Sequence, residues 1–279
     1  MERILVVEQI KEFEKHLRKE EKSLITIEKY IRDVQKFIEY TSEKAIDKEW
    51  VISYKKMLID RKYAVASINS MLASVNSFLK YLGWQECCVK GIRMQKKIYC
   101  AEEKELSKEE YGRLLSVAKE KPRLNLLLQT ICSTGIRVSE VKYFTVEAVK
   151  NGEIHVACKN KNRIVILPNK LKRMLLKYAK QNQIEDGIIF RTKAGNVMNR
   201  SNIWGEMKAL CEKAKVNPAK VFPHNLRKLF ARMFYKVDRD IAKLADVLGH
   251  NSINTTRIYI ISSGAEHRKQ IERLGLLLP

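Results

Sequence analysis

Apolar residues recur at helical spacing through most of this 279-residue chain, and only one short stretch is rich in strand-forming residues. One helix face is marked by apolar side chains three and four residues apart, at Ile27, Tyr30, Ile31, Val34, Phe37 and Ile38. The β-rich stretch consists of two runs, Ile154–Ala157 and Arg163–Leu167, separated by a polar turn. The sequence therefore predicts a mainly α-helical protein with one small β-hairpin.

A basic stretch without periodicity, residues 91–104, predicts a linker between two domains, since 279 residues are long for a single core. The first domain, residues 1–90, is expected to hold four helices. They are the segments 8–19 and 27–38, a helix over Trp50–Leu58 with Asp47 as its cap, and a helix over Val65–Leu82 that stops at Gly83. The second domain is expected to cover residues 105–279.

The second domain shows its own helix signals. Ser107 and Glu110 form a capping-box pattern, and a mostly apolar helix over Arg123–Ser133 is expected to end at Gly135. Arg137 then begins a short helix that places it on one face with Glu140. Further helices are expected at about 169–182, 200–214, 224–236, 239–248, 252–260 and 264–274.

The charge balance constrains the partner. Lys and Arg number 54 against 32 Asp and Glu, which gives a formal net charge of +22. Such an excess favours a polyanionic partner, most commonly nucleic acid, although a lysine-rich composition without any binding role is the alternative. No apolar stretch approaches the roughly 20 residues of a membrane span, and the N-terminus lacks the layout of a signal peptide.

Cysteine usage predicts a reduced, cytoplasmic protein without a structural disulfide. The six cysteines form no CxxC pair and no Cys/His spacing suited to zinc. For a chain of this charge, we expect a cytoplasmic location in association with the nucleoid.

Three separated motifs carry the candidate chemistry. They are Thr134–Glu140 (TGIRVSE), Pro223–Arg227 (PHNLR), and Leu248–His250 (LGH) followed nine residues later by a tyrosine. Each is weak alone, because a histidine and an arginine three residues apart, or a single tyrosine, often occur by chance. Together they supply two arginines that can neutralise a phosphate, two imidazoles that can move protons, and a phenol that can attack phosphorus. These groups are Arg137, Arg227, His224, His250 and Tyr259.

The order and content of these motifs resemble those of the tyrosine recombinases, of the phage integrase and Xer type. That family carries an arginine in TG-x-R-x-S-E, a second box beginning HxLR, and a third box LGH followed by TTxxY, and all three are matched here. The four basic helices of residues 1–90 resemble the family's SAM-like core-binding domain. The resemblance thus implies a helical DNA-binding domain followed by a mostly helical α/β domain that breaks and rejoins DNA.

The resemblance also implies a role for each group. Tyr259 would attack the scissile phosphorus and form a 3′-phosphotyrosine with a free 5′-hydroxyl. Arg137 and Arg227 would hold the non-bridging oxygens, His250 would donate a further hydrogen bond to them, and His224 would accept the phenol proton. Arginine and lysine replace a divalent ion in this chemistry, so no metal is expected. No ATP is expected either, because the chain has no GxxxxGK(S/T) loop and the exchange of one phosphodiester for another conserves bond energy.

The family's catalytic lysine has two candidates in this chain. The hairpin turn Cys158–Arg163 is one residue shorter than the family pattern GKGNKxR. Alignment from the left favours Lys159, whereas a fixed distance to the second strand favours Lys161; we prefer Lys159 as the acid that protonates the leaving 5′-oxygen. Glu140 is expected to orient Arg137 or His224. Lys228 stands where the family usually has a histidine, outside the core catalytic positions.

The expected partner is double-stranded DNA with specific recombination sites, bound by a homotetramer, alone or with a second recombinase or an accessory protein. The tail, residues 264–279, is expected to pack on a neighbouring protomer, and the short N-terminus to leave no room for an additional arm-binding domain. A type IB topoisomerase-like strand transferase and a catalytically silent DNA-binding protein are the alternatives. Phosphate contacts are expected from Lys29, Arg32, Lys36, Lys55, Lys62, Lys96 and Lys97.

Overall fold

The chain forms two compact units, Met1–Lys96 and Lys97–Pro279. The computed structural model describes residues 3, 5, 8–41, 45–93, 105–158, 161–192, 194–260 and 272–273, without the side chains of residues 158 and 161. Within these residues, no helix has both the length and the apolar character that a membrane crossing requires.

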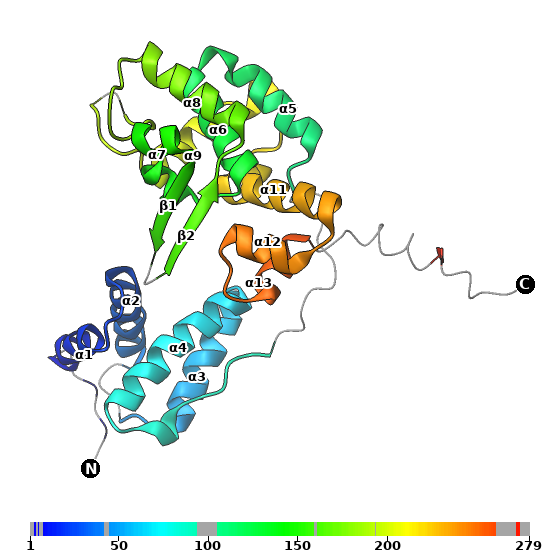
Figure 1. Cartoon of the computed structure of the whole chain (residues 1–279). Helices are drawn as coiled ribbons and strands as arrows, with labels where there is room; N and C mark the ends of the chain where they lie inside the picture. Colours follow the sequence, from blue (N-terminus) through cyan, green and yellow to red (C-terminus); the bar gives the residue numbers. More distant parts are fainter. Residues whose placement is uncertain are drawn as a thin grey trace, which may run out of the picture. The chain divides into compact units, whose positions relative to one another are not determined.

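The first unit is a bundle of helices (Figure 1). Its elements are α1 (Glu8–Lys19), α2 (Leu24–Thr41), α3 (Lys48–Asp60), α4 (Val65–Tyr81) and the 3₁₀-helix η1 (Gln85–Cys87). All four helices were predicted, because apolar spacing and end signals agree along this part of the chain. Asp47 caps α3 by accepting the Trp50 N–H at 2.8 Å, and Gly83 adopts the left-handed conformation just after α4.

The core of the first unit is rich in aromatic side chains. Phe37 and Tyr54 meet edge to face with ring centroids 5.0 Å apart, and Phe13 lies 5.1 Å from Phe78. All four rings are fully buried. Such pairs contribute beyond the burial of their area, and they join α1 to α4 and α2 to α3.

The second unit is mostly helical with one hairpin. It contains α5 (Lys108–Val117), η3 (Ala118–Glu120), α6 (Pro122–Thr134), η4 (Val138–Tyr143), α7 (Val146–Asn151), β1 (Glu153–Cys158), β2 (Lys161–Ile166), α8 (Asn169–Gln181), α9 (Arg200–Lys208), α10 (Cys211–Ala214), η5 (Pro218–Lys220), α11 (Pro223–Asp238), α12 (Ile241–Leu248) and α13 (Ile253–Ile260). The helix α6 is buried along most of its length and packs against α8 and α11. The prediction of a mainly helical chain with a small sheet is therefore confirmed.

The hairpin β1–β2 projects from the helical body of the second unit (Figure 1). Its strands are antiparallel, and the last pair joins Cys158 to Lys161, so the connection consists of residues 159 and 160, which lie outside the described residues. One face buries Ile154, Val156 and Val165, whereas the opposite face exposes hydrophobic side chains of β2 such as Ile166. The hairpin thus has an inner face that packs on its own unit.

Several predicted boundaries were wrong. The helix expected at 200–214 breaks after α9, because the Leu210 N–H bonds to the Met207 carbonyl at 3.2 Å, a tight turn that puts Leu210 in the core. The helix expected from 239 begins at Ile241, because Arg239 adopts φ +54° and Asp240 becomes the cap. The helix expected after Arg137 is a 3₁₀-helix, and β2 ends one residue before Leu167. The predicted tail helix, 264–274, falls outside the described residues except for 272–273.

Candidate active site

Four segments of the second unit meet around one point. Arg137 precedes η4, His224 and Arg227 lie on the first turns of α11, His250 follows α12, and Tyr259 lies on α13. They converge because α11 packs against α6, α12 and α13. The structure thus brings together five of the residues singled out in the sequence, while Lys159 and the side chain of Lys161 lie outside the described residues.

Tyr259 is held between the two imidazoles. Its ring lies edge to face with His224 at a centroid distance of 5.0 Å and with His250 at 5.1 Å, with interplanar angles of 87° and 82°. The Arg227 guanidinium carbon lies 5.9 Å from the same ring. The tyrosine is buried, and its helix packs through the small apolar cluster that includes Ala231 and Leu248. Two imidazoles and one guanidinium thus surround the Tyr259 ring.

Arg227 is fully buried. Its Nη1 donates to the Gly135 carbonyl, and its Nη2 donates to the Leu248 carbonyl at 2.7 Å. Burial, together with the charge of Arg137, lowers the pKa of Arg227 to about 10, so it stays charged at neutral pH. Its buried Nε has no hydrogen-bond partner among the described residues.

His250 is fixed in one tautomer by its neighbours. Its Nε2 lies 2.9 Å from Arg227 Nη2, and because a guanidinium can only donate, Nε2 must accept. The proton therefore sits on Nδ1, which donates to the Thr256 hydroxyl at 2.9 Å. Partial burial and the charges of Arg227 and Arg137 lower the pKa of His250 to about 4. The ring is neutral at pH 7.

Arg137 is anchored by Glu140, the carboxylate that we expected to orient either Arg137 or His224. Glu140 Oε1 accepts from Arg137 Nη1 at 3.0 Å, and Oε2 accepts the Arg137 backbone N–H at 2.7 Å. Burial alone would raise the pKa of Glu140, but hydrogen bonds from Arg163 and from the Arg137 backbone outweigh it and lower the pKa. Arg137 Nη2 also donates to the Gly249 carbonyl at 3.3 Å, and its side chain is still 39% exposed. The guanidinium is thus both oriented and accessible.

His224 faces a concavity of about 810 Å³. Partial burial and the charges of Lys228 and Arg227 lower its pKa, so the ring is neutral at physiological pH. The walls combine cations with apolar side chains, and they include Arg137, Arg227, Lys142, Arg200, Trp204 and Phe222. No group of three or more His, Cys, Asp or Glu side chains in the described part of the chain is placed to hold a metal ion.

Two residues of this site were missed in the sequence. Arg163 on β2 donates to Glu140 at 2.5 Å, and the fully buried Thr256 bonds to His250. The signal for Arg163 was its spacing of two residues from Val165, which places both side chains on the same, inward face of the strand. A charged residue on that face requires a partner. For Thr256 it was the spacing of three residues before Tyr259 on one helix, which places both on one face.

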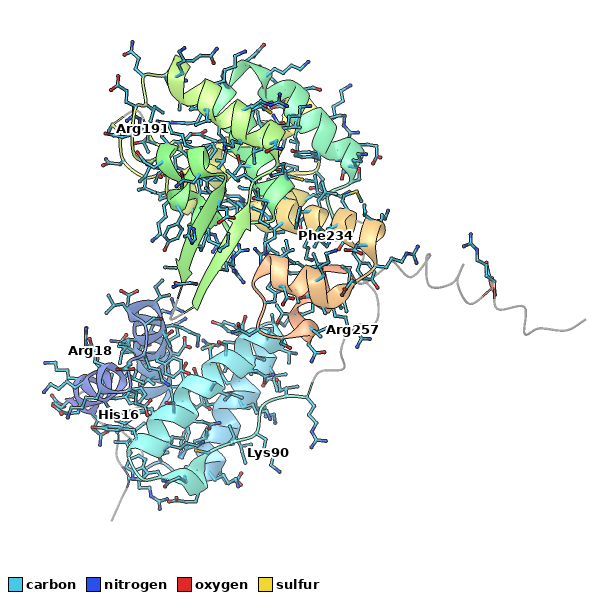
Figure 2. All side chains as sticks on the ribbon, viewed as in Figure 1. His16, Arg18, Lys90, Arg191, Phe234 and Arg257 are labelled. Atoms are coloured by element: carbon cyan, nitrogen blue, oxygen red, sulfur yellow. The ribbon has the colours of Figure 1, made fainter. Side chains whose placement is uncertain are left out.

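The basic residues predicted to contact DNA differ in their surroundings. Lys29 Nζ donates to Asp33 at 2.6 Å, to the Ser74 hydroxyl at 2.9 Å and to the Ser70 carbonyl at 3.0 Å, which argues against its predicted phosphate contact. Lys55 donates to the Lys90 carbonyl at 2.9 Å. Figure 2 shows the side chains of the described residues, including Lys90 at the surface of the first unit. Three of the remaining five are exposed, namely Arg32, Lys36 and Lys62. The other two, Lys96 and Lys97, lie outside the described residues.

Comparison with known families accounts for both units. Residues 104–266 match the phage integrase family, and residues 10–86 match the phage integrase N-terminal SAM-like domain. The chain belongs to the phage integrase family. It is a tyrosine-type site-specific DNA recombinase, similar to the Xer proteins.

Relatives and solved structures agree with this assignment. Tyrosine recombinase XerA of Pyrococcus furiosus is 28% identical over 286 residues, which cover 99% of this chain and 97% of the relative. The fold is similar to that of XerH bound to a palindromic difH substrate, with a TM-score of 0.72 and 19% identity over 95% of this chain and 84% of that one. A lambda integrase tetramer bound to a Holliday junction gives a TM-score of 0.72 and 16% identity over 90% of this chain and 76% of that one. The two-domain recombinase fold predicted from the motifs is thereby confirmed.

Proposed function

We propose that this recombinase cuts DNA by transferring a phosphodiester to Tyr259 and rejoins it through the reverse step, with a 3′-phosphotyrosine as intermediate. The observation that carries the proposal is the placement of Tyr259 between His224 and His250, next to the buried Arg227. A phenol enclosed by two imidazoles and a guanidinium has both an acceptor for its proton and compensation for the charge of the phosphate.

In the cutting step, the Tyr259 oxygen bonds to phosphorus as the bond from phosphorus to the 5′-oxygen breaks. His224 accepts the phenol proton, since its lowered pKa keeps it neutral near pH 7. The leaving 5′-oxygen takes a proton from Lys159, or from Lys161 if the shorter turn shifts the lysine position. A 5′-hydroxyl from the same or another duplex then attacks phosphorus and gives its proton to the lysine, while the bond from phosphorus to Tyr259 breaks and His224 returns the phenol proton.

The two arginines bind the non-bridging oxygens from fixed positions. Arg227 is fixed by the Gly135 and Leu248 carbonyls, and Arg137 offers the exposed part of a guanidinium that Glu140 holds in place. His250 accepts from Arg227 without DNA, so it donates to the phosphate only after Nε2 gains a proton. A bound phosphate favours that proton because the negative charge opposes the shift produced by the arginines.

At the level of the whole assembly, four copies on two DNA sites would exchange strands. The similarity to a lambda integrase tetramer on a Holliday junction supports this arrangement. Residues 1–90 would bind the core site, residues 105–279 would carry out the chemistry, and the tail would join neighbouring copies. Nucleoid association follows from binding to chromosomal DNA.

Covalent capture tests the chemistry. The protein is incubated with fragmented host DNA and nicked duplexes in EDTA, stopped with SDS, and the attached DNA is sequenced. We expect an adduct for the native protein and for Tyr235→Phe, whose ring packs on the same small cluster, and none for Tyr259→Phe. An adduct of Tyr259→Phe would overturn the proposal.

A second assay separates recombination from simple resealing. Two duplexes with different labels, both carrying the captured site, are mixed with the protein. Recombinants that carry both labels are expected. Resealing of each duplex without exchange would indicate a topoisomerase-like activity instead.

A further inference from the structure

Among the described side chains of the hairpin, that of Arg163 is a charged one on the inner face. Arg163 is paired across the strands with Val156, and the next pair on this face joins Val165 to Ile154. These three apolar neighbours are buried. A cation on such a face is unfavourable unless it is paired and hydrogen-bonded, so the position of Arg163 requires specific partners.

Arg163 reaches its partners in two other elements. Its Nη2 donates to Glu140 Oε2 at 2.5 Å, and its Nη1 donates to the Val247 carbonyl of α12 at 2.7 Å. The side chain is only 14% exposed. It also passes directly over Gly249, where an added Cβ would lie 2.4 Å from Arg163 Cδ. The absence of a side chain at Gly249 is therefore what lets the guanidinium through.

These contacts connect the hairpin to both arginines of the site. Glu140 holds Arg137 through its other oxygen, and Val247 is adjacent to Leu248, whose carbonyl accepts from Arg227. On the other strand, the Tyr143 hydroxyl donates to the Ala157 carbonyl at 2.5 Å, which ties the hairpin to η4 but to neither arginine. Arg163 thus connects the hairpin to the segments that hold Arg137 and Arg227. Tyr143 also contacts the hairpin, but it bonds to neither arginine.

We propose that Arg163 is a positioning residue that fixes the hairpin, and with it the lysine that protonates the leaving oxygen, relative to Arg137 and Arg227. This proposal rests on the proposed function. Lys161 precedes Arg163 by two residues and Lys159 by four, so a shift of β2 moves either lysine. A misplacement of about 1 Å can cost about 100-fold in rate. The two hydrogen bonds of Arg163 lie within four residues of both candidate lysines, so their loss is expected to shift the lysine enough to slow the reaction.

Sulfur substitution distinguishes this role from a general effect on the site. In a duplex with sulfur in place of the scissile 5′-bridging oxygen, the leaving group is a thiolate. A thiol has a pKa of about 8.5, far below that of an alcohol, so it leaves without help from an acid. We therefore compare single-turnover cleavage of the ordinary and the sulfur-containing duplex, both carrying the site found by covalent capture.

Arg163→Lys and Arg163→Gln are expected to cleave the ordinary duplex about 10- to 100-fold more slowly, and the sulfur-containing duplex within about threefold of the native rate. Arg137→Lys should be slow on both duplexes, because it loses contact with the phosphate itself. Tyr143→Phe should lose less than Arg163→Lys on the ordinary duplex. If the Arg163 variants are equally slow on both duplexes, Arg163 acts through Glu140 and the arginines alone, and the proposal is wrong.

Amide hydrogen exchange tests the anchor without DNA. Arg163→Lys should exchange faster in residues 153–158, 161–166 and 245–250, with α5 unchanged as an internal reference. Unchanged exchange in the hairpin would overturn the proposal even if the enzyme is active. Failure of the native protein to form an adduct on any DNA would refute the proposed function. The hydrogen-exchange result does not depend on catalysis, so the two failures can be distinguished. Arg163→Lys keeps the charge and carries the test if Arg163→Gln does not fold.

Discussion

Each unit of the molecule contains a buried carboxylate paired with a cation, but the two are used differently. Asp33 in the first unit is 3% exposed, and Glu140 in the second is 2% exposed. Both lie within helical segments, and both accept hydrogen bonds from a basic side chain four or three residues away, Lys29 and Arg137 respectively. The chemical pairing is the same, so its surroundings decide what it does.

The pair in the first unit is closed. The three protons of Lys29 are shared among Asp33, Ser74 and Ser70, and Ser74 donates to Asp33 as well at 3.0 Å. This network joins α2 to α4 and leaves no donor for a ligand. In the second unit one cation remains accessible, because Arg137 is 39% exposed although Glu140 holds it. The closed network joins two helices, whereas the second pair leaves a guanidinium that a ligand can reach.

Replacement of the buried arginine of the candidate site should have the largest effect. Arg227→Lys keeps a positive charge but loses the guanidinium fork that binds two carbonyls and His250. We expect single-turnover adduct formation at saturating DNA to fall by about 100- to 1,000-fold, as for loss of a transition-state donor. The matched change in the closed network, Lys29→Gln, should leave this rate constant within about threefold of native when the protein is folded.

The comparison fails if the two variants behave alike. A comparable loss of adduct formation in Lys29→Gln at saturating DNA would mean that the closed network takes part in the chemistry. Circular dichroism and thermal melting at the assay temperature confirm that both proteins are folded.

Neutralising the two carboxylates should have similar effects on stability and different effects on activity. Asp33→Asn removes the countercharge of the partly exposed Lys29, and Glu140→Gln removes that of Arg137 and Arg163. Each should lower the free energy of unfolding by about 1–3 kcal/mol. Only Glu140→Gln should also slow adduct formation, because it frees Arg137 and Arg163 to move. Urea unfolding of each variant, together with single-turnover cleavage, provides the test. A slow Asp33→Asn would contradict the separation of roles.

The elements of both units that were predicted correctly depend on local signals. The helix Glu8–Lys19 was predicted with the bounds that the structure gives, and Gly135 ends α6 in the left-handed conformation as expected. Apolar spacing, caps and glycines act over a few residues, so they can be read directly. The five candidate site residues could be singled out because their motifs are themselves short.

What the sequence did not reveal depends on contacts across the chain. Arg227 is buried because its partners Gly135 and Leu248 lie 92 and 21 residues away, and Arg163 bonds to Val247 across 84 residues. The closed state of Lys29 depends on Ser74, 45 residues further along. Such distances have no local signature, and therefore neither the burial of Arg227 nor the hydrogen-bond network around Lys29 could be predicted from the sequence.

The pH dependence of stability should come from the open site. The pKa of His250 is about 4 in the folded chain and lies near 6.5 when unfolded, so the unfolded state binds more protons between these values. The free energy of unfolding is therefore unaffected above pH 6.5 and falls as the pH drops toward 4. Discounted for the partial exposure of the ring, the loss should be about 1–2 kcal/mol.

His250→Asn should lack this loss. The difference in unfolding free energy between native protein and His250→Asn, measured from pH 7.5 to 4.5, isolates the contribution of His250 from that of the carboxylates. A difference that does not change with pH would show that His250 does not titrate below its usual range.

The smallest effect concerns DNA affinity, and it separates Lys29 from its neighbours on the same helix. Lys36 is exposed, whereas Lys29 is bound internally. If Lys36 contacts a phosphate, Lys36→Gln should reduce the slope of log K against log salt by about 0.9, since one fewer counterion is released. Lys29→Gln should leave the slope unchanged, because its charge is already matched by Asp33.

Fluorescence anisotropy with a labelled duplex measures both slopes between about 50 and 200 mM salt. Over this salt range each phosphate contact alters the affinity by only about threefold. A reduced slope for Lys29→Gln would show that the closed network opens when DNA binds, and the distinction between the two units would then hold only for the free protein.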